Sequence, residues 1–455
     1  MLKSFADRSR VLTYQTCPRK RYFEYEIETE GSVGGVRPVK LDMNLILGST
    51  FHAGIECLLT SAKTVKMPYT LAPEEVDYAV DYALNGAGDW TGYWPSVKIM
   101  GLQLEAEEDA SYVYYEQAAL AEALIRGYAA FVLPDLLDRF TVVDVEREEV
   151  GTFTAGDYTL TFGARVDGIL LEKNTLNIYV LSLKTAKEWG KRDDQSARHD
   201  MQGLSETRVV EQRLQAWQRF LDERSSDPNP VLGDGSIVTG VPDWFYKRAL
   251  AGGTPTVTGV KMEFALKGRR ENSPKGSGTY KYNNPLIRPW KKADDLGGMG
   301  YAIAYEFQDE MGGNHRLGKG WNRVNIWEDM GVKAWINYLM THEVQGFPAG
   351  RGVMSQFILP VEYFRNAEDM DRWERQVVHQ EKRITQGRDE LAGIYGIAFE
   401  HRLDEHFPMH TKSCDWPTKC SFQEVCFGPP AYLHDPISSM LFQIRVPNHP
   451  TEVNA

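Results

Sequence analysis

Four of the five cysteines lie toward the two ends of the chain, and this placement constrains the fold more than any other sequence feature. Cys414, Cys420 and Cys426 fall within one short segment, whereas Cys17 lies near the opposite end of the 455 residues. Clustered thiolates of this kind bind zinc or an iron–sulfur cluster, and both groups take four ligands. Cys17 is the fourth ligand if the two terminal segments meet in the fold.

The remaining cysteine and the nearby histidines leave alternatives open. For a zinc ion, His406 or His410 is an alternative fourth ligand. Cys57 lies in an apolar helical stretch and is predicted to be a small buried hydrophobe. An odd cysteine count without an apolar signal segment disfavours a framework of disulfides. The sequence therefore predicts one ligand cluster and one structural cysteine.

Composition limits the class of protein. The chain is 42% hydrophobic and 11% aromatic, which is enough apolar surface for a large core. The sequence contains no run of about 18 apolar residues, so it predicts no membrane-spanning helix. The first residues also lack the apolar core of a signal peptide. We therefore expect a cytoplasmic protein without a membrane partner. The net charge of −12 argues against a general nucleic-acid coat protein, but not against a local basic groove.

Hydrophobic periodicity separates helical ends from a strand-rich centre. Helices are predicted at 10–26 with a break near Cys17, from about 48 with Ser49 or Thr50 as the cap, and at 72–85, 104–133, 207–223 and 366–393. Strands are predicted at 142–146, 158–171, 176–183 and 237–241. The predicted regions are a helical N-terminal region at 1–140, an α/β core at 141–260, a basic and aromatic insertion at 261–345, a C-terminal helix with the cysteine segment at 346–430, and a tail at 431–455.

The hairpin around residues 163–185 carries the residues best suited to chemistry. Strand periodicity places Ser182 and Lys184 on one face, and Asp167 lies on the preceding strand. A carboxylate in this position is suited to hold a hard cation such as Mg²⁺, which polarises a phosphate and activates water. A neighbouring lysine stabilises the negative charge that develops. The pattern is typical of metal-assisted phosphodiester hydrolysis, although most strand-borne Asp and Lys pairs are merely solvated.

These blocks occur together in one known family. The chain resembles the RecB-like branch of the PD-(D/E)xK nuclease superfamily, in particular phage and CRISPR-associated exonucleases with an iron–sulfur cluster. The similar segments are 14–20 (Y-x-x-C-P-R-K), 48–52 (G-x-x-x-H), 163–167 (the block of the first metal-binding Asp), 182–185 ((D/E)-x-K-T), 240–245 (a following core strand) and the three C-terminal cysteines. The resemblance runs from about Ser9 to Cys426.

The resemblance implies a fold and its cofactors. The fold is α/β and restriction-endonuclease-like, with a central mixed sheet flanked by helices and with helical N- and C-terminal segments stapled by a 4Fe–4S cluster. The implied cluster ligands are Cys17, Cys414, Cys420 and Cys426. The implied site for Mg²⁺ or Mn²⁺ comprises His52, Asp167, Glu146 and Leu183, and the implied catalytic positions are Asp167, Ser182 and Lys184.

The implied activity is a divalent-metal-dependent DNA exonuclease, a hydrolase that acts in recombination, repair or degradation. Its implied partners are linear or single-stranded DNA ends and a single-strand annealing protein or helicase, in the host cytoplasm if the chain is phage-encoded. Expected DNA contacts are Arg19, Lys20, Gln212, Gln215, Lys267, Arg269 and Arg270. The basic residues and aromatic rings of 261–292 either contact phosphates and bases or form only a solvated loop.

Two departures from the family pattern matter. Ser182 stands where the family has Asp or Glu, and a neutral hydroxyl is a poor ligand for Mg²⁺. Either the protein is inactive, by nature or by an engineered substitution, or another acid compensates, with Glu146 and Glu188 as candidates. The alternatives to a nuclease are a non-cleaving DNA-binding protein and a zinc-stapled scaffold. The downstream Q-x-x-x-Y element is only approximate around Gln212 and Gln215.

Overall fold

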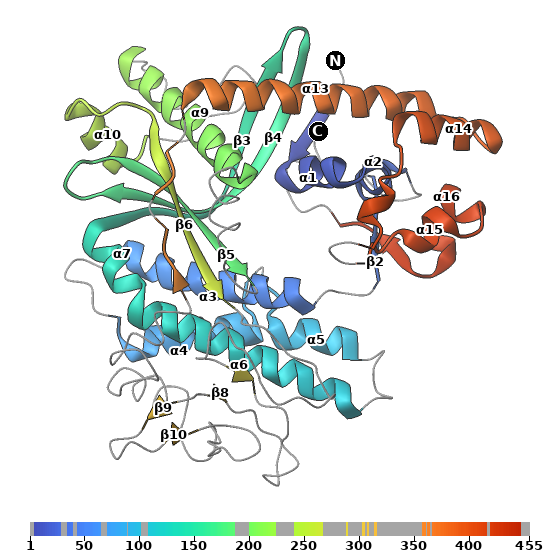
Figure 1. The fold of residues 1–455 in the computed structure, drawn as a ribbon. Helices are drawn as coiled ribbons and strands as arrows, with labels where there is room; N and C mark the ends of the chain where they lie inside the picture. The colour runs from blue at the N-terminus through green and yellow to red at the C-terminus, as the bar shows by residue number, and fades with distance from the viewer. Residues whose placement is uncertain are drawn as a thin grey trace.

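The fold is mixed α/β, with a central mixed sheet between helical layers (Figure 1). This confirms the coarse fold class predicted from the sequence. The computed structural model describes residues 4–28, 34–39, 43–64, 71–88, 90–101, 108–186, 200–223, 241–266, 357–360, 362–364, 366–415 and 419–446, together with the short strands β7 (Arg288–Pro289), β8 (Ile303–Ala304), β9 (Phe307–Gln308) and β10 (Asn314–His315).

The central sheet is built on an antiparallel meander. Its strands are β1 (Ser4–Asp7), β3 (Phe140–Ala155), β4 (Tyr158–Glu172), β5 (Ile178–Ala186), β6 (Val257–Leu266) and β11 (Phe357–Ile358). The order is β1-β4-β5-β6-β11, and β3 also pairs with β4. Tight turns join β3, β4 and β5 as antiparallel neighbours, whereas the parallel pair β5–β6 needs a crossover connection. Because β1 joins the sheet, the N-terminal region is not wholly helical as predicted.

One face of the sheet is covered by a layer of helices. These are α3 (Met43–Thr64), α4 (Pro73–Asn85), α5 (Tyr93–Gly101), α6 (Glu108–Phe131) and α7 (Leu133–Arg139). The largest apolar cluster joins this layer to Leu181 and Leu183 of β5. The segment Leu45–Lys63 is long and apolar enough to cross a membrane, but its buried side chains pack in this cluster, as in a core helix.

The start of α3 corrects one sequence prediction. Ser49 and Thr50 lie inside the helix rather than at its cap. The Thr50 hydroxyl donates to the carbonyl of Ile46 at 2.8 Å, and Thr50 is fully buried. A hydroxyl that bonds to the carbonyl four residues earlier is compatible with a helix interior, so the capping signal was misleading here.

The opposite face of the sheet is covered by α9 (Met201–Glu223), which supplies the crossover from β5 to β6. The predicted strand at 240–245 is wrong from Asp243 onward, because α10 (Asp243–Leu250) begins there, with Pro242 at its N-cap and an acidic residue in its first turn. The core strand after α9 is β6. Its residues 261–266 therefore belong to the core, not to the predicted insertion.

A second lobe, which we call the cysteine lobe, is joined to the sheet by the long helix α13 (Ala367–Leu391) (Figure 1). Its elements are α1 (Arg8–Thr16), α2 (Pro18–Arg21), a π-helix (Tyr22–Glu26), β2 (Val36–Pro38), α14 (Ile397–His406), a 3₁₀ turn (Thr411–Ser413), α15 (Gln423–Phe427), α16 (Ala431–His434), a second 3₁₀ turn (Pro436–Ser439) and β12 (Phe442–Ile444). The break predicted near Cys17 is confirmed.

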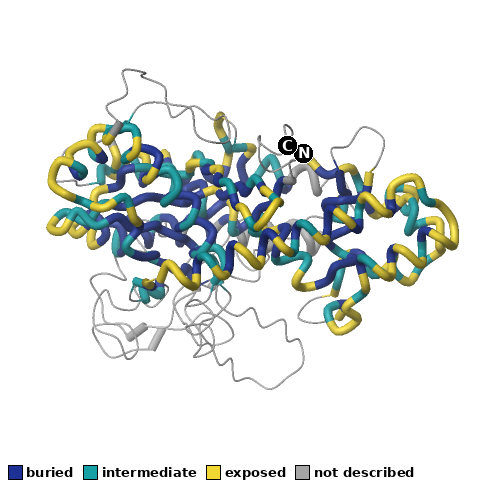
Figure 2. Tube along the Cα trace, turned by 90° about the horizontal axis from the view of Figure 1, so that it is seen from above, coloured by how far each residue is buried: buried dark blue, intermediate teal, exposed yellow. Residues whose placement is uncertain are grey.

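The cysteine lobe has its own apolar interior. Phe422 stacks between Phe23 and Phe442, with ring centroids 5.8 and 4.7 Å away. β12 pairs antiparallel with β2. Figure 2 shows buried segments in both lobes, with exposed chain around them. Residues 431–444 are therefore part of a folded lobe rather than of the predicted tail.

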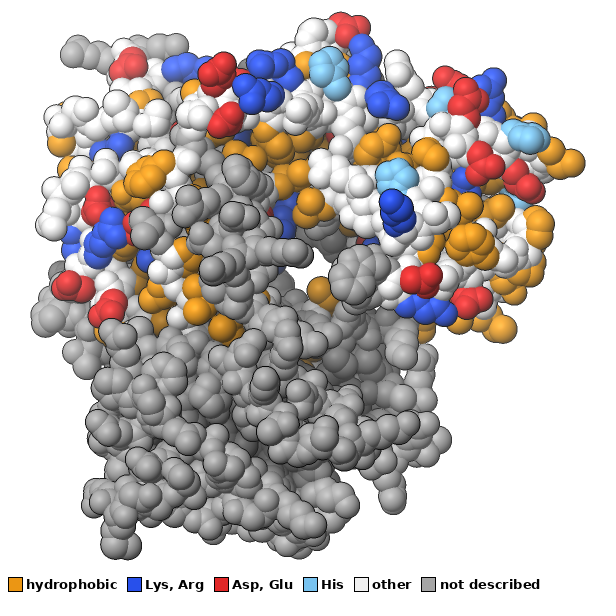
Figure 3. All heavy atoms as spheres, in the orientation of Figure 1, with side chains coloured by type: hydrophobic (Ala, Val, Ile, Leu, Met, Phe, Trp, Pro, Cys, Tyr) orange, Lys and Arg blue, Asp and Glu red, His pale blue; other side chains and the backbone are white. Residues whose placement is uncertain are grey.

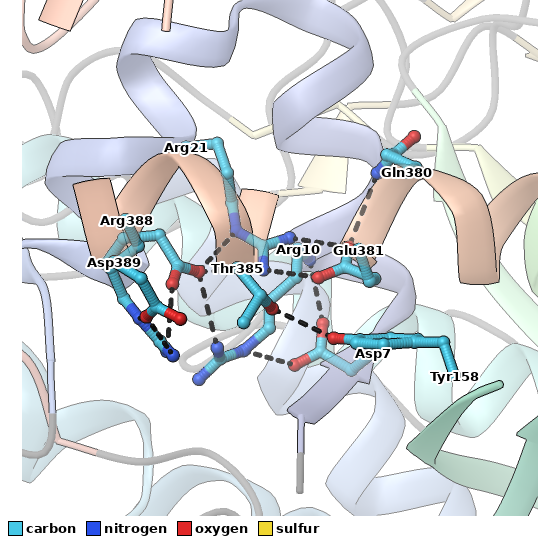
Figure 4. Close-up of polar contacts among 10 residues, drawn as sticks. Asp7, Arg10, Arg21, Tyr158, Gln380, Glu381, Thr385, Arg388 and Asp389 are labelled. Atoms are coloured by element: carbon cyan, nitrogen blue, oxygen red, sulfur yellow. Dashed lines mark hydrogen bonds and ion pairs between the residues drawn. The ribbon is translucent and has the colours of Figure 1, made fainter. Parts of the chain in front are cut away.

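A buried ion network ties α13 to the N-terminal helices (Figure 4). Arg21 is 1% exposed and donates to both oxygens of Glu381 at 3.1 and 2.9 Å and to Glu26 at 3.0 Å. Arg10 pairs with Asp7 and Glu26. Removing one partner of such a buried pair costs about 3–5 kcal/mol, because a charge is left without compensation. The network therefore fixes how the two lobes meet.

Candidate metal centre and cysteine lobe

Two strands and one helix bring three potential metal ligands together. Glu146 on β3 and Asp167 on β4 lie between the paired positions Val145–Gly168 and Arg147–Val166 of the β3–β4 ladder. His52 on α3 places its Nδ1 3.3 Å from Asp167 Oδ1. One ligand atom from each of the three residues lies within 4.8 Å of the others. The structure thus brings together the three side chains predicted for the metal set.

A backbone hydrogen bond orients Asp167, and Glu146 has an unusual backbone conformation. The Leu183 N–H donates to Asp167 Oδ2 at 2.6 Å, so the main chain of this predicted metal residue orients the carboxylate. Glu146 has a φ of 44°, in the left-handed region that an L-residue adopts at a cost of about 1–2 kcal/mol. Arg165 pairs with Glu146 at 2.5 Å. Strain of this kind is concentrated at functional sites.

The electrostatics of the three ligands fit a divalent cation. Burial, with the neighbouring Asp167 charge, raises the pKa of Glu146 to about 8. Burial acts to lower the pKa of His52, but the Asp167 carboxylate outweighs it and holds that pKa above its ordinary value. Two close carboxylates and an imidazole therefore crowd negative charge into a buried space. Carboxylate oxygens are the ligands that Mg²⁺ and Mn²⁺ prefer, so this donor set fits such an ion.

Lys184 extends the site along β5. Its Nζ bonds to Asp200 at 3.3 Å and to the side-chain oxygen of Gln202. Burial, with the charge of Arg8 nearby, lowers the pKa of Lys184. Ser182 is fully buried, and its Oγ has no hydrogen-bond partner among the described residues.

Sequence reasoning missed the residues of α9 that surround Lys184. Gln202 begins a Q-x-x-x spacing at the start of α9, and Glu206 occupies the last position of that spacing, where the family element has Tyr. The predicted candidate Gln212 instead exchanges hydrogen bonds of 2.8 and 2.9 Å with the backbone of Thr152. Gln215 is exposed.

The structure describes only some of the residues that were predicted to contact DNA. Arg19 is 2% exposed, donates to the Phe407 carbonyl at 2.8 Å and pairs with Asp404, so the predicted phosphate contact for Arg19 is wrong in this conformation. Lys20 is partly exposed and pairs with Glu24 at 3.8 Å. Outside the described residues lie Lys267, Arg269, Arg270 and the compensating candidate Glu188.

The structure brings Cys17 to the C-terminal cysteine segment. The backbone N–H of His410 donates to Cys17 Sγ at 3.5 Å, and the N–H of Cys420 donates to the Cys414 carbonyl at 2.7 Å. Burial raises the pKa of Cys426 to about 12, and the thiols of Cys17, Cys420 and Cys414 add to the shift against the nearby Arg19 charge. The expectation that the terminal segments meet is therefore confirmed, while the identity of any bound group stays a prediction.

The thiol spacing bears on which group these cysteines fit. Among the described residues, no three of the four thiols lie within 4.8 Å of one another. Sulfurs about 2.3 Å from one zinc ion would lie about 3.8 Å apart. Of the two alternative zinc ligands, His406 pairs with Glu390 at 3.0 Å. His410 lies beside Cys17, and its Nδ1 contacts the Thr16 carbonyl at 3.1 Å.

Cys57 differs from the other four cysteines. It is half-buried against the largest apolar cluster, and burial raises its pKa to about 11. It is thus a packing residue, although less buried than predicted.

The surface shows no simple charged face in the view of Figure 3. Lys and Arg side chains alternate with Asp and Glu along α13, and apolar side chains gather on the cysteine lobe. Exposed apolar residues of that lobe include Tyr395, Ile397, Phe427, Met440 and Leu441.

Neither a scan against protein-family models nor a search of the curated proteins finds a match for this chain.

Proposed function

We propose that this chain is a divalent-metal-dependent deoxyribonuclease of the RecB-like PD-(D/E)xK type. The observation that carries the proposal is the convergence of Glu146, Asp167 and Lys184 of the β3–β4–β5 meander on His52 of α3, whose charge all three influence. A strained backbone at Glu146 and a buried lysine are unusual in a purely structural sheet. Together they support a catalytic site for phosphodiester hydrolysis.

The roles of the residues follow from their positions. His52, Glu146 and Asp167 hold Mg²⁺ or Mn²⁺, and the Leu183 N–H keeps the Asp167 carboxylate aimed at the ion. The bound ion supplies Lewis acidity toward the phosphate and lowers the pKa of water. Lys184 contributes a positive charge beside the phosphate, where it stabilises the negative charge that develops. Its bonds to Asp200 and Gln202 fix its position.

The cysteine lobe supports the same proposal at a second place. Cys17, Cys414, Cys420 and Cys426 lie near one another, since the other three thiols all act on the pKa of Cys426. We propose that they hold a 4Fe–4S cluster, which fastens the N-terminal helices to the C-terminal segment. The proposed substrate is linear DNA with free ends, and a single-strand annealing protein or helicase is the proposed partner.

A second candidate function is a DNA-binding protein that keeps this fold without cutting. The observation that favours it is Ser182, whose hydroxyl takes the place of the family acid and has no partner. In that case metal binding is weak and DNA binding persists. The two candidates differ in whether an acid at position 182 changes cleavage.

Labelled linear DNA, single- and double-stranded, tests the proposal with Mg²⁺ and with Mn²⁺. If no other acid compensates for Ser182, we expect Ser182→Asp or Ser182→Glu to raise cleavage strongly. Lys184→Ala should abolish cleavage in every background. The matched control is Lys382→Ala, since Lys382 is a surface lysine on α13 that pairs with Asp157. If neither acidic variant cuts or binds any DNA, the nuclease proposal fails.

The cluster is tested separately by anaerobic purification. We expect brown protein with about four iron atoms per chain. Colourless protein with stoichiometric zinc would contradict the cluster and leave the nuclease proposal standing.

A further inference from the structure

Ser182 lies on the face of β5 that α9 covers. Ile178 and Val180 pack in the apolar cluster that contains Val210 and Leu214 of α9. Alternate residues of a strand share a face, so Ser182 continues this row toward α9. Leu181 and Leu183 face the other way, into the α3 layer, as their membership of the largest cluster shows. The residue replaced by Ser182 would therefore have pointed at α9.

Glu206 lies on the matching stripe of α9. Residues three and four apart occupy one helix face, which aligns Glu206 with Val210 and Leu214 and therefore with the sheet. One turn earlier on the same stripe, Gln202 contacts Lys184 through its side-chain oxygen. Glu206 is 1% exposed, and its charge interacts with Asp167 and Lys184. Its carboxyl therefore approaches the metal centre from the side on which Ser182 faces.

One buried polar atom on β5 and one on α9 lack a hydrogen bond in the described part of the chain. Glu206 Oε2 and Ser182 Oγ are both buried and have no hydrogen-bond partner among the described residues. Gln202 hydrogen-bonds to the Glu206 carboxyl but does not satisfy Oε2. A buried polar atom without a hydrogen bond costs about 1–3 kcal/mol, so each of these two atoms needs a physical explanation.

We infer that Glu206 supplies from α9 the second carboxylate that Ser182 lacks on β5, and that it binds the divalent cation together with Asp167. The small Ser182 side chain leaves room for the longer Glu206 to reach the sheet. This inference rests on the proposed function and changes one part of it. The protein as it stands is then a complete metal site, with the acid moved from strand to helix.

Mn²⁺ binding, measured by electron paramagnetic resonance and calorimetry, tests this inference without relying on activity. We expect Glu206→Gln to weaken Mn²⁺ binding about tenfold or more, since affinity for hard cations depends on the charge of the ligands. Glu211→Gln is the matched control on the same helix, because Glu211 accepts a bond from the Val257 N–H and does not face Lys184. We expect it to bind Mn²⁺ like the parent.

The double variant Ser182→Asp with Glu206→Gln returns the acid to the strand, and we expect it to recover most of the lost affinity. Glu→Gln keeps size and shape, and melting temperatures verify that each variant is folded. If the parent binds Mn²⁺ and Glu206→Gln binds equally well, the inference is overturned and the proposed function survives. If neither the parent nor Ser182→Asp binds Mn²⁺, the proposed function itself fails.

Discussion

The metal centre and the cysteine lobe are organised in opposite ways. At the metal centre, a regular antiparallel ladder and one long helix bring His52, Glu146 and Asp167 within ligand distance. In the cysteine lobe, short helices and turns hold Cys17 beside the C-terminal cysteines, with thiols spaced more widely. The first site is preorganised by the sheet, whereas the second has little regular structure to fix its ligands.

This difference concerns what each bound group does for the protein. A cation that enters a preformed site changes chemistry more than folding. A cluster that joins segments with few backbone ladders contributes its binding free energy to folding itself. We therefore expect ligand removal to abolish activity at the first site and structure at the second, and the predictions below test that division.

The largest expected effect is at Cys17. Structural metal sites contribute on the order of 10 kcal/mol, so Cys17→Ser should lose the iron and unfold the cysteine lobe. Iron content and limited proteolysis measure the two losses, with new cleavage expected in residues 397–444. Cys57→Ser is the control and should keep both the iron and the protease resistance. A Cys17→Ser protein with full iron content would refute the assignment.

The next effect concerns Asp167, at the centre of the metal site. Asp167→Asn should reduce DNA cleavage about a thousandfold, which corresponds to about 4 kcal/mol of activation free energy. The melting temperature should change little, because Asn can still accept the Leu183 N–H bond that orients residue 167. Initial rates on end-labelled DNA measure the effect. Activity within tenfold of the parent would remove Asp167 from the site.

A smaller effect is expected where the two lobes meet. Glu381→Gln breaks the buried pair with Arg21 and should lower the free energy of unfolding by about 3 kcal/mol. Denaturant unfolding measures it. Glu405→Gln, on a surface pair with Arg402, is the matched control and should cost less than about 1 kcal/mol. Equal losses for the two variants would mean that the buried network does not join the lobes.

The smallest effect is a pH dependence of the metal-free protein. The raised pKa values of Glu146, about 8, and of His52 both favour the protonated folded state. Their stabilisation is complete below the unfolded pKa values and is lost as pH rises through the folded ones. In EDTA, the melting temperature should therefore fall as the pH rises from about 5 to about 8.5.

Glu146→Gln is the control for this titration, since other buried acids also contribute to the overall profile. It should flatten the fall, and saturating Mn²⁺ should remove it. If Glu146→Gln and the parent give parallel curves, the Glu146 carboxyl does not titrate as described.

The sequence predicted the positions of helices and strands better than it predicted which residues contact one another in the fold. The strands around Asp167 and Lys184 were visible because alternation over a half-buried sheet follows side-chain burial directly. The meeting of Cys17 with the C-terminal segment was implied by the family resemblance, since the thiols alone left His406 and His410 as alternatives. By contrast, α10 replaced a predicted strand, since a short segment with Trp244 and Phe245 suits either state until tertiary packing decides.

Glu206 shows why part of the site was hidden from sequence reasoning. In the sequence it is one acid among many on an amphipathic helix. Its proposed role rests on the packing of α9 against β5, which brings its carboxyl near Asp167 and Lys184. Arg19 shows the reverse error, because its basic neighbours indicated a surface charge and the fold turns it inward. Helix rotation and inward-facing charges are set by packing, which composition does not encode.

The pairing of the earliest and latest parts of the chain has a consequence for biosynthesis. Arg19 donates a hydrogen bond to the Phe407 carbonyl, 388 residues later in the chain. In the same way, β2 cannot form its antiparallel pair until β12 has been synthesised. On the ribosome, the β3–β4–β5 meander is complete long before residues 397–444 emerge. Nascent chains should therefore pass through a state with an assembled metal centre and an open N-terminal arm, and delivery of the cluster would come after synthesis as the closing event of maturation.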